Sequence, residues 1–170
     1  LFPALSCDSV EGTCVEIMPG DSEALLEAVN LLEDDTTVVL AKGTWMLANQ
    51  VTFRDAKGVR FVGQGIDESI LSFKDSVVQT NGVDVIGDVF TIEGLTIEDA
   101  KKDALRIEDS KGVTIRRVKV TWTNGPAPEN GAYGIYPVRC FDVLMEECEA
   151  YHAADAGLYI GQCVRAIVRN

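Results

Sequence analysis

The sequence predicts an all-β chain wound as a single-stranded, right-handed parallel β-helix, with one capping α-helix near its N-terminus. The first observation is a repeat, because segment 104–107 returns at 134–137 and again at 157–160. A recurring unit of about 20–30 residues marks a solenoid, in which each unit buries its apolar face only against its neighbours. The second observation is the alternation of apolar with polar residues inside each copy, the pattern of a strand with one buried face.

A second series of segments keeps the same spacing and extends the repeat towards the N-terminus. Its members are 59–61, 90–92, 113–115, 143–145 and 166–168. Leucine-rich repeats would show a fixed Leu/Asn skeleton, and helical repeats would show a stripe of period 3.6; neither pattern occurs. We therefore expect short parallel strands stacked about 4.8 Å apart.

A capping helix is predicted over residues 22–32, after an irregular leader whose residues 15–17 suit a first short strand. Asp21 or Ser22 can accept hydrogen bonds from the free amides of the first turn. The side chains of Leu25, Val29 and Leu32, joined by Leu26, fall on one face of this helix. We expect residues 1–35 to form a leader and cap that covers the first coil, and residues 36–170 to form the coils.

The remaining elements follow as strands and corners. Strands are expected at 36–41, 44–47, 50–53, 58–63, 69–73, 90–97, 104–107 and 113–120, with a further coil starting at 83 and corners at 99–103 and 108–112. The coil from 104 to 134 is longer than the coil from 134 to 157, and its extra residues lie between Trp122 and Tyr133. Insertions in a solenoid usually map to functional loops, so we expect a site near this loop.

The repeats resemble those of the pectate-lyase-like superfamily of right-handed parallel β-helices over residues 38–170. The run PGD, a helix and then VVLAKGTW (38–45) is similar to a common opening of such proteins. The runs 129–137 and 155–162 more closely resemble a family of uncharacterised bacterial β-helix proteins, often lipoproteins. The resemblance implies the fold and an extracytoplasmic location, whether periplasmic, anchored to the outer membrane or secreted. It implies no particular reaction.

The acidic composition argues against several classes of binding partner. The 15 basic and 27 acidic residues give a net charge of −12. Such a surface repels nucleic acid and anionic membranes, and it repels acidic polysaccharides unless metal ions or a local Arg/Lys cluster intervene. The sequence contains no apolar run long enough to predict a transmembrane segment.

The two ends of the sequence also lead to expectations. The chain begins at Leu1 without a Met, which suggests a removed leader or a fragment. The last repeat stops inside its strand at Asn170, so we expect the natural protein to continue. We expect an open final coil to favour self-association.

The five cysteines are expected to play structural roles. Cys7 and Cys14 lie close enough in sequence to form a small disulfide in an oxidising compartment. The other three, Cys140, Cys148 and Cys163, fall on repeat positions and are expected to be small apolar ladder residues. A zinc site is not indicated, because no Cys-x-x-Cys pair occurs and His152 is the only histidine.

Residues one repeat apart should be neighbours, which predicts an exposed aromatic wall. Arg106, Tyr136 and Tyr159 should form one column, facing outward because each alternates with buried aliphatic residues. Trp122 should lie beside His152 in a second column. Other side chains expected near the wall are those of Glu129, Asn130, Tyr133, Tyr151 and Asp155, with Asp103 under Tyr133 and Asp109 under Arg139.

Such a wall suits a glycan, because sugar C–H faces pack on aromatic rings and hydroxyls meet nearby polar groups. We therefore predict a protein that binds a glycan or a cell-surface partner without catalysis. The alternative interpretation is that the aromatic residues only stabilise adjacent strands, at ~0.2–1 kcal/mol per pair.

An enzymatic alternative stays open. A polysaccharide lyase or C5-epimerase acting on a uronate polymer needs a base, an acid and a cation for the carboxylate, and Tyr133, His152 and Arg139 are residues of the right types. The stretch 133–138 is similar to the Tyr-Gly-Phe-Asp-Pro-His motif of alginate epimerases. However, Tyr136 stands where that motif has Asp, and Val138 where it has His. This resemblance implies loss of the acid–base pair.

Three further alternatives concern hydrolysis, calcium binding and copper-enzyme maturation. A glycoside hydrolase would need paired carboxylates, for which Glu129 and Asp155 are candidates. No cofactor is expected, although calcium could be held by Asp99, Asp103 and Asp109. A structural role in copper-enzyme maturation has little support from one histidine and no Met-rich tract.

Overall fold

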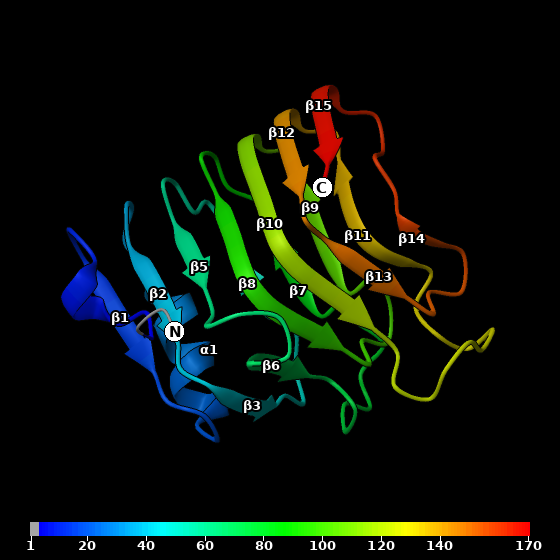
Figure 1. The fold of residues 1–170 in the computed structure, drawn as a ribbon, viewed down its shortest axis with the longest axis horizontal. Coiled ribbons are helices and arrows are strands. Elements are labelled where there is room, and N and C mark those ends of the chain that lie inside the picture. The colour runs from blue at the N-terminus through cyan, green and yellow to red at the C-terminus, as the bar shows by residue number, and fades with distance from the viewer. Residues whose placement is uncertain (1–3) are drawn as a thin grey trace.

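The computed structural model describes residues 4–170 and shows the predicted parallel β-helix with one α-helix (Figure 1). The elements in chain order are η1 (Cys7–Ser9), β1 (Cys14–Ile17), α1 (Ser22–Asn30), β2 (Thr37–Leu40), β3 (Gly43–Met46), β4 (Val51–Phe53), β5 (Arg60–Val62), β6 (Ser69–Ser72), β7 (Val83–Val85), β8 (Thr91–Glu98), β9 (Leu105–Glu108), β10 (Lys111–Thr121), β11 (Tyr133–Val138), β12 (Phe141–Glu146), β13 (Glu149–Tyr151), β14 (Ala156–Leu158) and β15 (Val164–Arg169).

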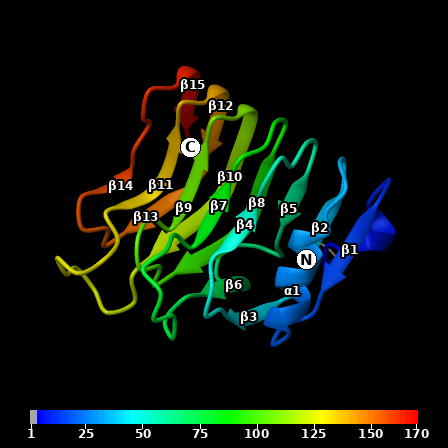
Figure 2. The same ribbon diagram turned by 180° about the vertical axis from the view of Figure 1, so that it is seen from behind.

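The strands form two parallel sheets that run the length of the solenoid. The main path of sheet A is β1-β2-β5-β8-β10-β12-β15, and β3, β6 and β13 extend it around a bend. The bend lies within the long strands, because the first half of β10 pairs with β12 and its second half with β13. Sheet B has the order β4-β7-β9-β11-β14 and is seen in Figure 2. The cross-section therefore has three sides around one core.

The strand register confirms the repeat spacing read from the sequence. In sheet B, Arg106 pairs with Tyr136 and Ile135 pairs with Leu158, as the returning segments predicted. The second series agrees, since Thr91 pairs with Thr114 and Thr114 with Leu144. Residues one repeat apart are therefore direct neighbours between coils.

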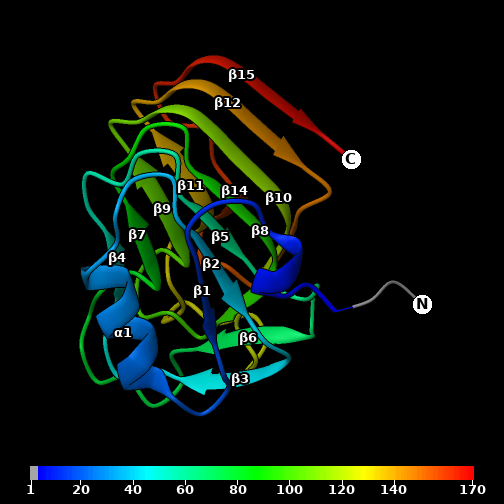
Figure 3. The same cartoon turned by 90° about the vertical axis from the view of Figure 1, so that its left-hand side faces the viewer.

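Helix α1 lies against β4, which is the first strand of sheet B in the sequence and one edge of that sheet (Figure 3). Asp21 caps the helix, because its Oδ1 accepts a hydrogen bond from the Ala24 amide at 2.8 Å. Leu25 and Val29 are buried in the core, as predicted. The helix ends at Asn30, slightly earlier than expected. Within residues 4–170, no helix has the length and apolarity needed to cross a membrane.

The core is a stack of aliphatic layers with aromatic residues concentrated in the N-terminal half. In sheet B, Val83, Leu105 and Ile135 are fully buried at successive paired positions. The ring of Phe53 contacts the rings of Phe61 and Phe90, with centroid distances of 5.2 and 5.0 Å. Burying each such side chain contributes about 1.5–3 kcal/mol. This core supports both sheets as rigid surfaces.

One corner of every coil uses the left-handed backbone conformation. The residues at this corner are Asp35, Gly58, Val89, Gly112, Asp142 and Arg165, with φ of 56, 67, 53, 74, 57 and 59°. This conformation suits Gly and Asp but is unfavourable for a β-branched residue. Val89 is therefore strained, and its side chain is 61% exposed, with little packing to offset the strain.

We expect Val89→Asn to raise the free energy of unfolding by ~1 kcal/mol, because Asn tolerates positive φ better than Val. Urea unfolding followed by circular dichroism measures the change. The matched control is Val77→Asn, since Val77 is 91% exposed and is not among the residues with positive φ. A loss of stability specific to Val89→Asn would contradict the strain at this corner.

The cysteines take the positions that the repeat suggested. Cys7 and Cys14 are joined by a disulfide, with their Cα atoms 5.5 Å apart. Cys140 is completely buried, and its thiol lies 3.4 Å from the carbonyl oxygen of Ile107 in the preceding coil. Cys148 and Cys163 are partly buried free thiols. Burial raises the pKa of the Cys140 thiol to about 11.

At pH 8 we expect iodoacetamide to label Cys163 before Cys140. Cys140 is buried, and its raised pKa keeps it almost entirely protonated, whereas the thiolate is the reactive form. Peptide mass spectrometry of time points gives the two rates, and all three free thiols should react after unfolding. Equal labelling of Cys140 and Cys163 in the folded protein would contradict this burial.

Candidate functional site

Three tyrosine rings pack together on the outer face of sheet B. Tyr133 and Tyr136 come from β11, and Tyr159 follows β14. The ring of Tyr133 lies 4.8 Å from that of Tyr136 and 4.9 Å from that of Tyr159. Tyr136 and Tyr159 stack with centroids 5.1 Å apart and 14° between their planes. We call these three residues the tyrosine cluster.

The tyrosine cluster extends the column predicted from the sequence. The guanidinium carbon of Arg106, on β9, lies 5.4 Å from the centre of the Tyr136 ring. These side chains point outward because they alternate with the buried Leu105 and Ile135. Tyr159, on the last coil described, is 43% exposed.

Glycines in the last two coils make room for the cluster. A Cβ added at Gly161 would lie 2.7 Å from the Tyr136 ring. A Cβ added at Gly134 would lie 2.3 Å from the carbonyl oxygen of Gly157. The absence of side chains at these positions lets β11 and β14 approach and lets the Tyr136 ring lie flat against the next coil.

Burial and nearby charges act on the ionisable groups beside the rings. The pKa of Tyr133 is raised, first by desolvation and then by the negative charge of Asp155. The pKa of Asp103 is also raised by desolvation, although the Tyr133 amide and Arg106 oppose this shift. At neutral pH the Tyr133 hydroxyl is therefore protonated and can both donate and accept hydrogen bonds.

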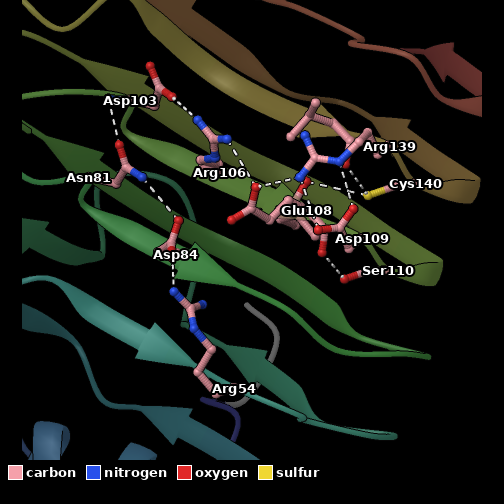
Figure 4. A network of polar contacts seen from close by, with 12 residues as sticks. Arg54, Asn81, Asp84, Asp103, Arg106, Glu108, Asp109, Ser110, Arg139 and Cys140 are labelled. Atoms are coloured by element: carbon pink, nitrogen blue, oxygen red, sulfur yellow. Dashed lines mark hydrogen bonds and ion pairs between the residues drawn. The ribbon is translucent and has the colours of Figure 1, made fainter.

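A network of arginines and carboxylates occupies the rest of the outer face of sheet B (Figure 4). We call it the arginine network. Its ion pairs are Arg54 with Asp84 at 2.5 Å, Arg106 with Asp103 at 3.6 Å and with Glu108 at 3.0 Å, and Arg139 with Glu108 at 3.0 Å and with Asp109 at 2.7 Å. Asn81 links two parts of it, since its side chain donates to Asp84 and accepts from the Asp103 amide. The network fixes each guanidinium group against the sheet.

Arg139, a candidate cation for a reacting uronate, is held at the far end of β11 from Tyr133. It follows Val138, the last residue of the strand, whereas Tyr133 is the first. At the usual rise of a strand, this places their Cα atoms about 20 Å apart. Arg139 donates two hydrogen bonds to Asp109, which raises the pKa of Arg139 and lowers that of Asp109. The structure does not bring these two candidates together.

His152 lies at the loop, beside Trp122 as the repeat predicted. Its Nδ1 is 3.0 Å from the Trp122 carbonyl oxygen, and its own carbonyl oxygen accepts a hydrogen bond from the Asn130 side chain at 2.7 Å. Trp122 differs from the rest of the predicted wall because its ring is only 3% exposed. The indole N–H donates to the carbonyl oxygen of Ala100 at 2.7 Å. Trp122 thus anchors the loop from within.

The predicted loop after β10 borders a pocket of about 270 Å³. The pocket is lined by Lys74, Asp99, Ala100, Lys101, Trp122, Thr123, Asn124, Glu129 and Asn130. The Asn130 side chain holds the loop in place by donating hydrogen bonds to the carbonyl oxygens of Gly125 and His152. The Asp99 carboxylate accepts hydrogen bonds from the amide and the hydroxyl of Thr123. Glu129 lines this pocket, whereas Asp155 is not among its lining residues.

The three aspartates considered for calcium are engaged separately. Asp99 accepts from Thr123, Asp103 pairs with Arg106, and Asp109 pairs with Arg139. Among residues 4–170, no three side chains of His, Cys, Asp or Glu gather in a metal-binding group.

Comparisons with known proteins agree with the fold. No family model matches the chain, and no curated protein matches it. A crystal structure from Parabacteroides merdae, provisionally assigned as a glycosyl hydrolase, is 18% identical with a TM-score of 0.60, over 82% of this chain and 72% of that one. An alginate lyase from a Paenibacillus species is 15% identical with a TM-score of 0.50, over 92% of this chain and 64% of that one. At these identities the similarity shows the parallel β-helix fold.

Four charged residues of the arginine network were named from the sequence, and the predicted contact of Asp109 with Arg139 is confirmed, but the other three were missed. Arg54 and Asp84 were not candidates, because the coils before β9 do not keep the two main spacings of the repeat. Glu108 was assigned to the corner 108–112, but it is the last residue of β9. Thr52 pairs with Asp84 and Asp84 with Arg106, and these two intervals differ in length from each other and from those of the later coils. A search that allowed variable spacing in the apolar pattern would have aligned these strands.

We expect Gly131→Ala to destabilise the protein and displace the loop. An added Cβ would lie 1.7 Å from the Lys102 carbonyl oxygen and 2.7 Å from the Trp122 ring, so the backbone must move. Thermal unfolding should show a loss of at least about 2 kcal/mol. The matched control is Gly157→Ala, whose Cβ would meet the Ala150 Cβ at 3.0 Å. Equal losses in both variants would contradict the tight seat of the loop.

Proposed function

We propose that this protein binds a polysaccharide on the outer face of sheet B and has no catalytic role there. The observation that carries the proposal is the tyrosine cluster, three mutually packed rings on a solvent-facing column. Stacking between strands accounts for the contact of Tyr136 with Tyr159, and the rings point away from the core because they alternate with buried residues such as Ile135. A sugar ring can pack its C–H face on such a surface.

The shape of the solenoid favours an extended ligand. Successive coils lie about 4.8 Å apart, so the outer face of sheet B repeats along one axis. Hydroxyl groups of a chain lying on this face would meet the tyrosine hydroxyls and the carboxylates of Asp103, Glu108 and Asp155. A few polar groups around an aromatic platform are typical of carbohydrate recognition.

The fold comparisons support a carbohydrate-related role. The two structures described above carry names of carbohydrate-acting proteins, although the chain spans only 72% and 64% of their lengths. We also infer an extracytoplasmic location and membership of the uncharacterised bacterial β-helix family that residues 129–137 resemble. The Cys7–Cys14 disulfide supports this location, because disulfides persist in oxidising compartments.

The second candidate is a polysaccharide lyase or C5-epimerase acting on a uronate polymer. Its support is the likeness of residues 133–138 to the alginate epimerase motif. The geometry favours it less than binding, because Arg139 is paired with Asp109 and Glu108 far from Tyr133. His152 has its Nδ1 directed at a backbone carbonyl oxygen, which occupies one of its two ring nitrogens.

We expect the double variant Tyr136→Ala, Tyr159→Ala to lose at least about 2 kcal/mol of binding free energy, because each substitution removes a stacking platform. Affinity electrophoresis across a broad polysaccharide panel, combined with a glycan array, measures the loss. The matched control is Tyr151→Ala, because Tyr151 is a 46% exposed tyrosine on β13 of sheet A. Circular dichroism confirms that both variants fold.

Unchanged retention of the double variant would reject the proposal. Incubation with alginate and pectate, followed for unsaturated products and for epimer signals by NMR, tests the catalytic candidate. Product formation that disappears in Tyr133→Phe, His152→Ala would favour the enzyme over the binding protein.

A further inference from the structure

The charges around the tyrosine cluster indicate the class of polysaccharide that this face accepts. Building on the binding role proposed above, we infer that the ligand is a neutral polysaccharide and not a uronate polymer. The cations on this face are already neutralised by protein carboxylates, whereas a carboxylate beside the rings has no cationic partner among the described residues.

Each arginine of the outer face of sheet B is paired within the protein. Arg106 lies between Asp103 and Glu108, and Arg139 between Glu108 and Asp109. With Arg54 on Asp84, the arginine network contains three guanidinium groups and four carboxylates. To bind a uronate, an arginine would have to leave a carboxylate that is then unpaired, which removes most of the gain.

Asp155 adds a negative charge next to the rings. Its side chain is exposed, and it forms no ion pair with any of residues 4–170. The next residue, Ala156, pairs with Tyr133, and the Asp155 amide donates to the carbonyl oxygen of Ala132, so Asp155 lies beside Tyr133. Its charge helps to raise the pKa of that tyrosine. A uronate carboxylate at this position would meet like charge, whereas a sugar hydroxyl can donate a hydrogen bond to it.

The unpaired cations of the described chain lie outside the strands of sheet B, although Lys102 directly precedes Asp103 and Lys57 borders a pocket with Asp109. They are Lys57, Arg60, Lys74, Lys101, Lys102 and Lys111. Arg60 and Lys111 begin strands of sheet A, and the others lie in connecting segments. Lys74 and Lys101 border the loop pocket. Within residues 4–170, no strand of sheet B therefore offers a free cation to a uronate carboxylate.

The carboxylates of the arginine network keep acceptor capacity for hydroxyl groups. Each ionised carboxylate has about four lone-pair directions. Glu108 uses two of them for arginine hydrogen bonds, and Asp103 accepts from the Tyr133 amide while pairing with Arg106. Neutral sugars present several hydroxyl donors per residue, which matches a face rich in acceptors.

The test compares charged polymers with neutral ones, including pairs that share a backbone. Alginate and polygalacturonate are used beside their carboxyl-reduced forms, with carboxymethylcellulose beside hydroxyethylcellulose and with neutral glucan, xylan, mannan and galactan. Affinity electrophoresis is run with EDTA, so that metal ions cannot bridge carboxylates. We expect retention by neutral polymers to be at least about ten-fold stronger than by uronates, and to depend on Tyr136 and Tyr159.

Two results separate the two proposals. Tyrosine-dependent retention by a uronate polymer that equals or exceeds retention by the neutral polymers would overturn the neutral-ligand inference and leave the binding role intact. Retention that is unaffected by Tyr136→Ala, Tyr159→Ala, or absent with every polymer, would overturn the binding role and the inference together.

A charge variant tests the cause directly. Asp155→Lys places a cation beside the tyrosine cluster, and its exposed position makes misfolding an unimportant complication. We expect the ratio of neutral to uronate retention to fall about ten-fold, with Asp155→Asn giving an intermediate ratio. An unchanged ratio in Asp155→Lys, in a protein folded by circular dichroism, would overturn the argument from charge.

Discussion

Hydrogen bonding between in-register parallel strands is the constraint on which the rest of the structure depends. Each coil offers its backbone groups to the coils before and after it, so every side chain is placed over the residue one repeat earlier. Buried aliphatic residues must then stack on aliphatic residues. Outward-facing residues must be compatible in size and charge with the residues at the paired positions of the adjacent coils. The tyrosine cluster and the arginine network are both consequences of this stacking.

On the outer face of sheet A, stacked charged residues alternate in sign. Glu93, Arg116, Glu146 and Arg169 occupy one column and alternate in sign. Arg116 lies 2.6 Å from Glu146, and Arg169 lies 2.8 Å from the same carboxylate, which lowers the pKa of Glu146. Like charges directly opposite would repel, so alternation lets a solenoid carry many charges on adjacent strands.

The outer faces of sheets A and B differ in the groups that they expose to solvent. On sheet A, the charged side chains of the column described above are paired with one another. On sheet B, the arginines are also paired within the protein, but the tyrosine rings and the Asp155 carboxylate face solvent. The inner strands of sheet B are hydrogen-bonded on both sides, which limits rearrangement of this face, whereas β14 at the edge of the described sheet is bonded on one side. A polysaccharide bound as proposed would meet the groups that this face already displays, so their charges bear on the class of ligand.

The sequence alone determined the fold class, the capping helix and the register of the regular coils. Apolar alternation and the spacing of the returning segments placed Arg106, Tyr136 and Tyr159 in one column, because in-register stacking turns sequence distance into spatial neighbourhood. Only the tertiary structure decided that Trp122 is buried, that Arg139 is paired at the far end of β11, and that Gly131 seats the loop. Those features depend on how an irregular loop packs and on which carboxylate a long side chain reaches. Neither is encoded in the period of the repeat.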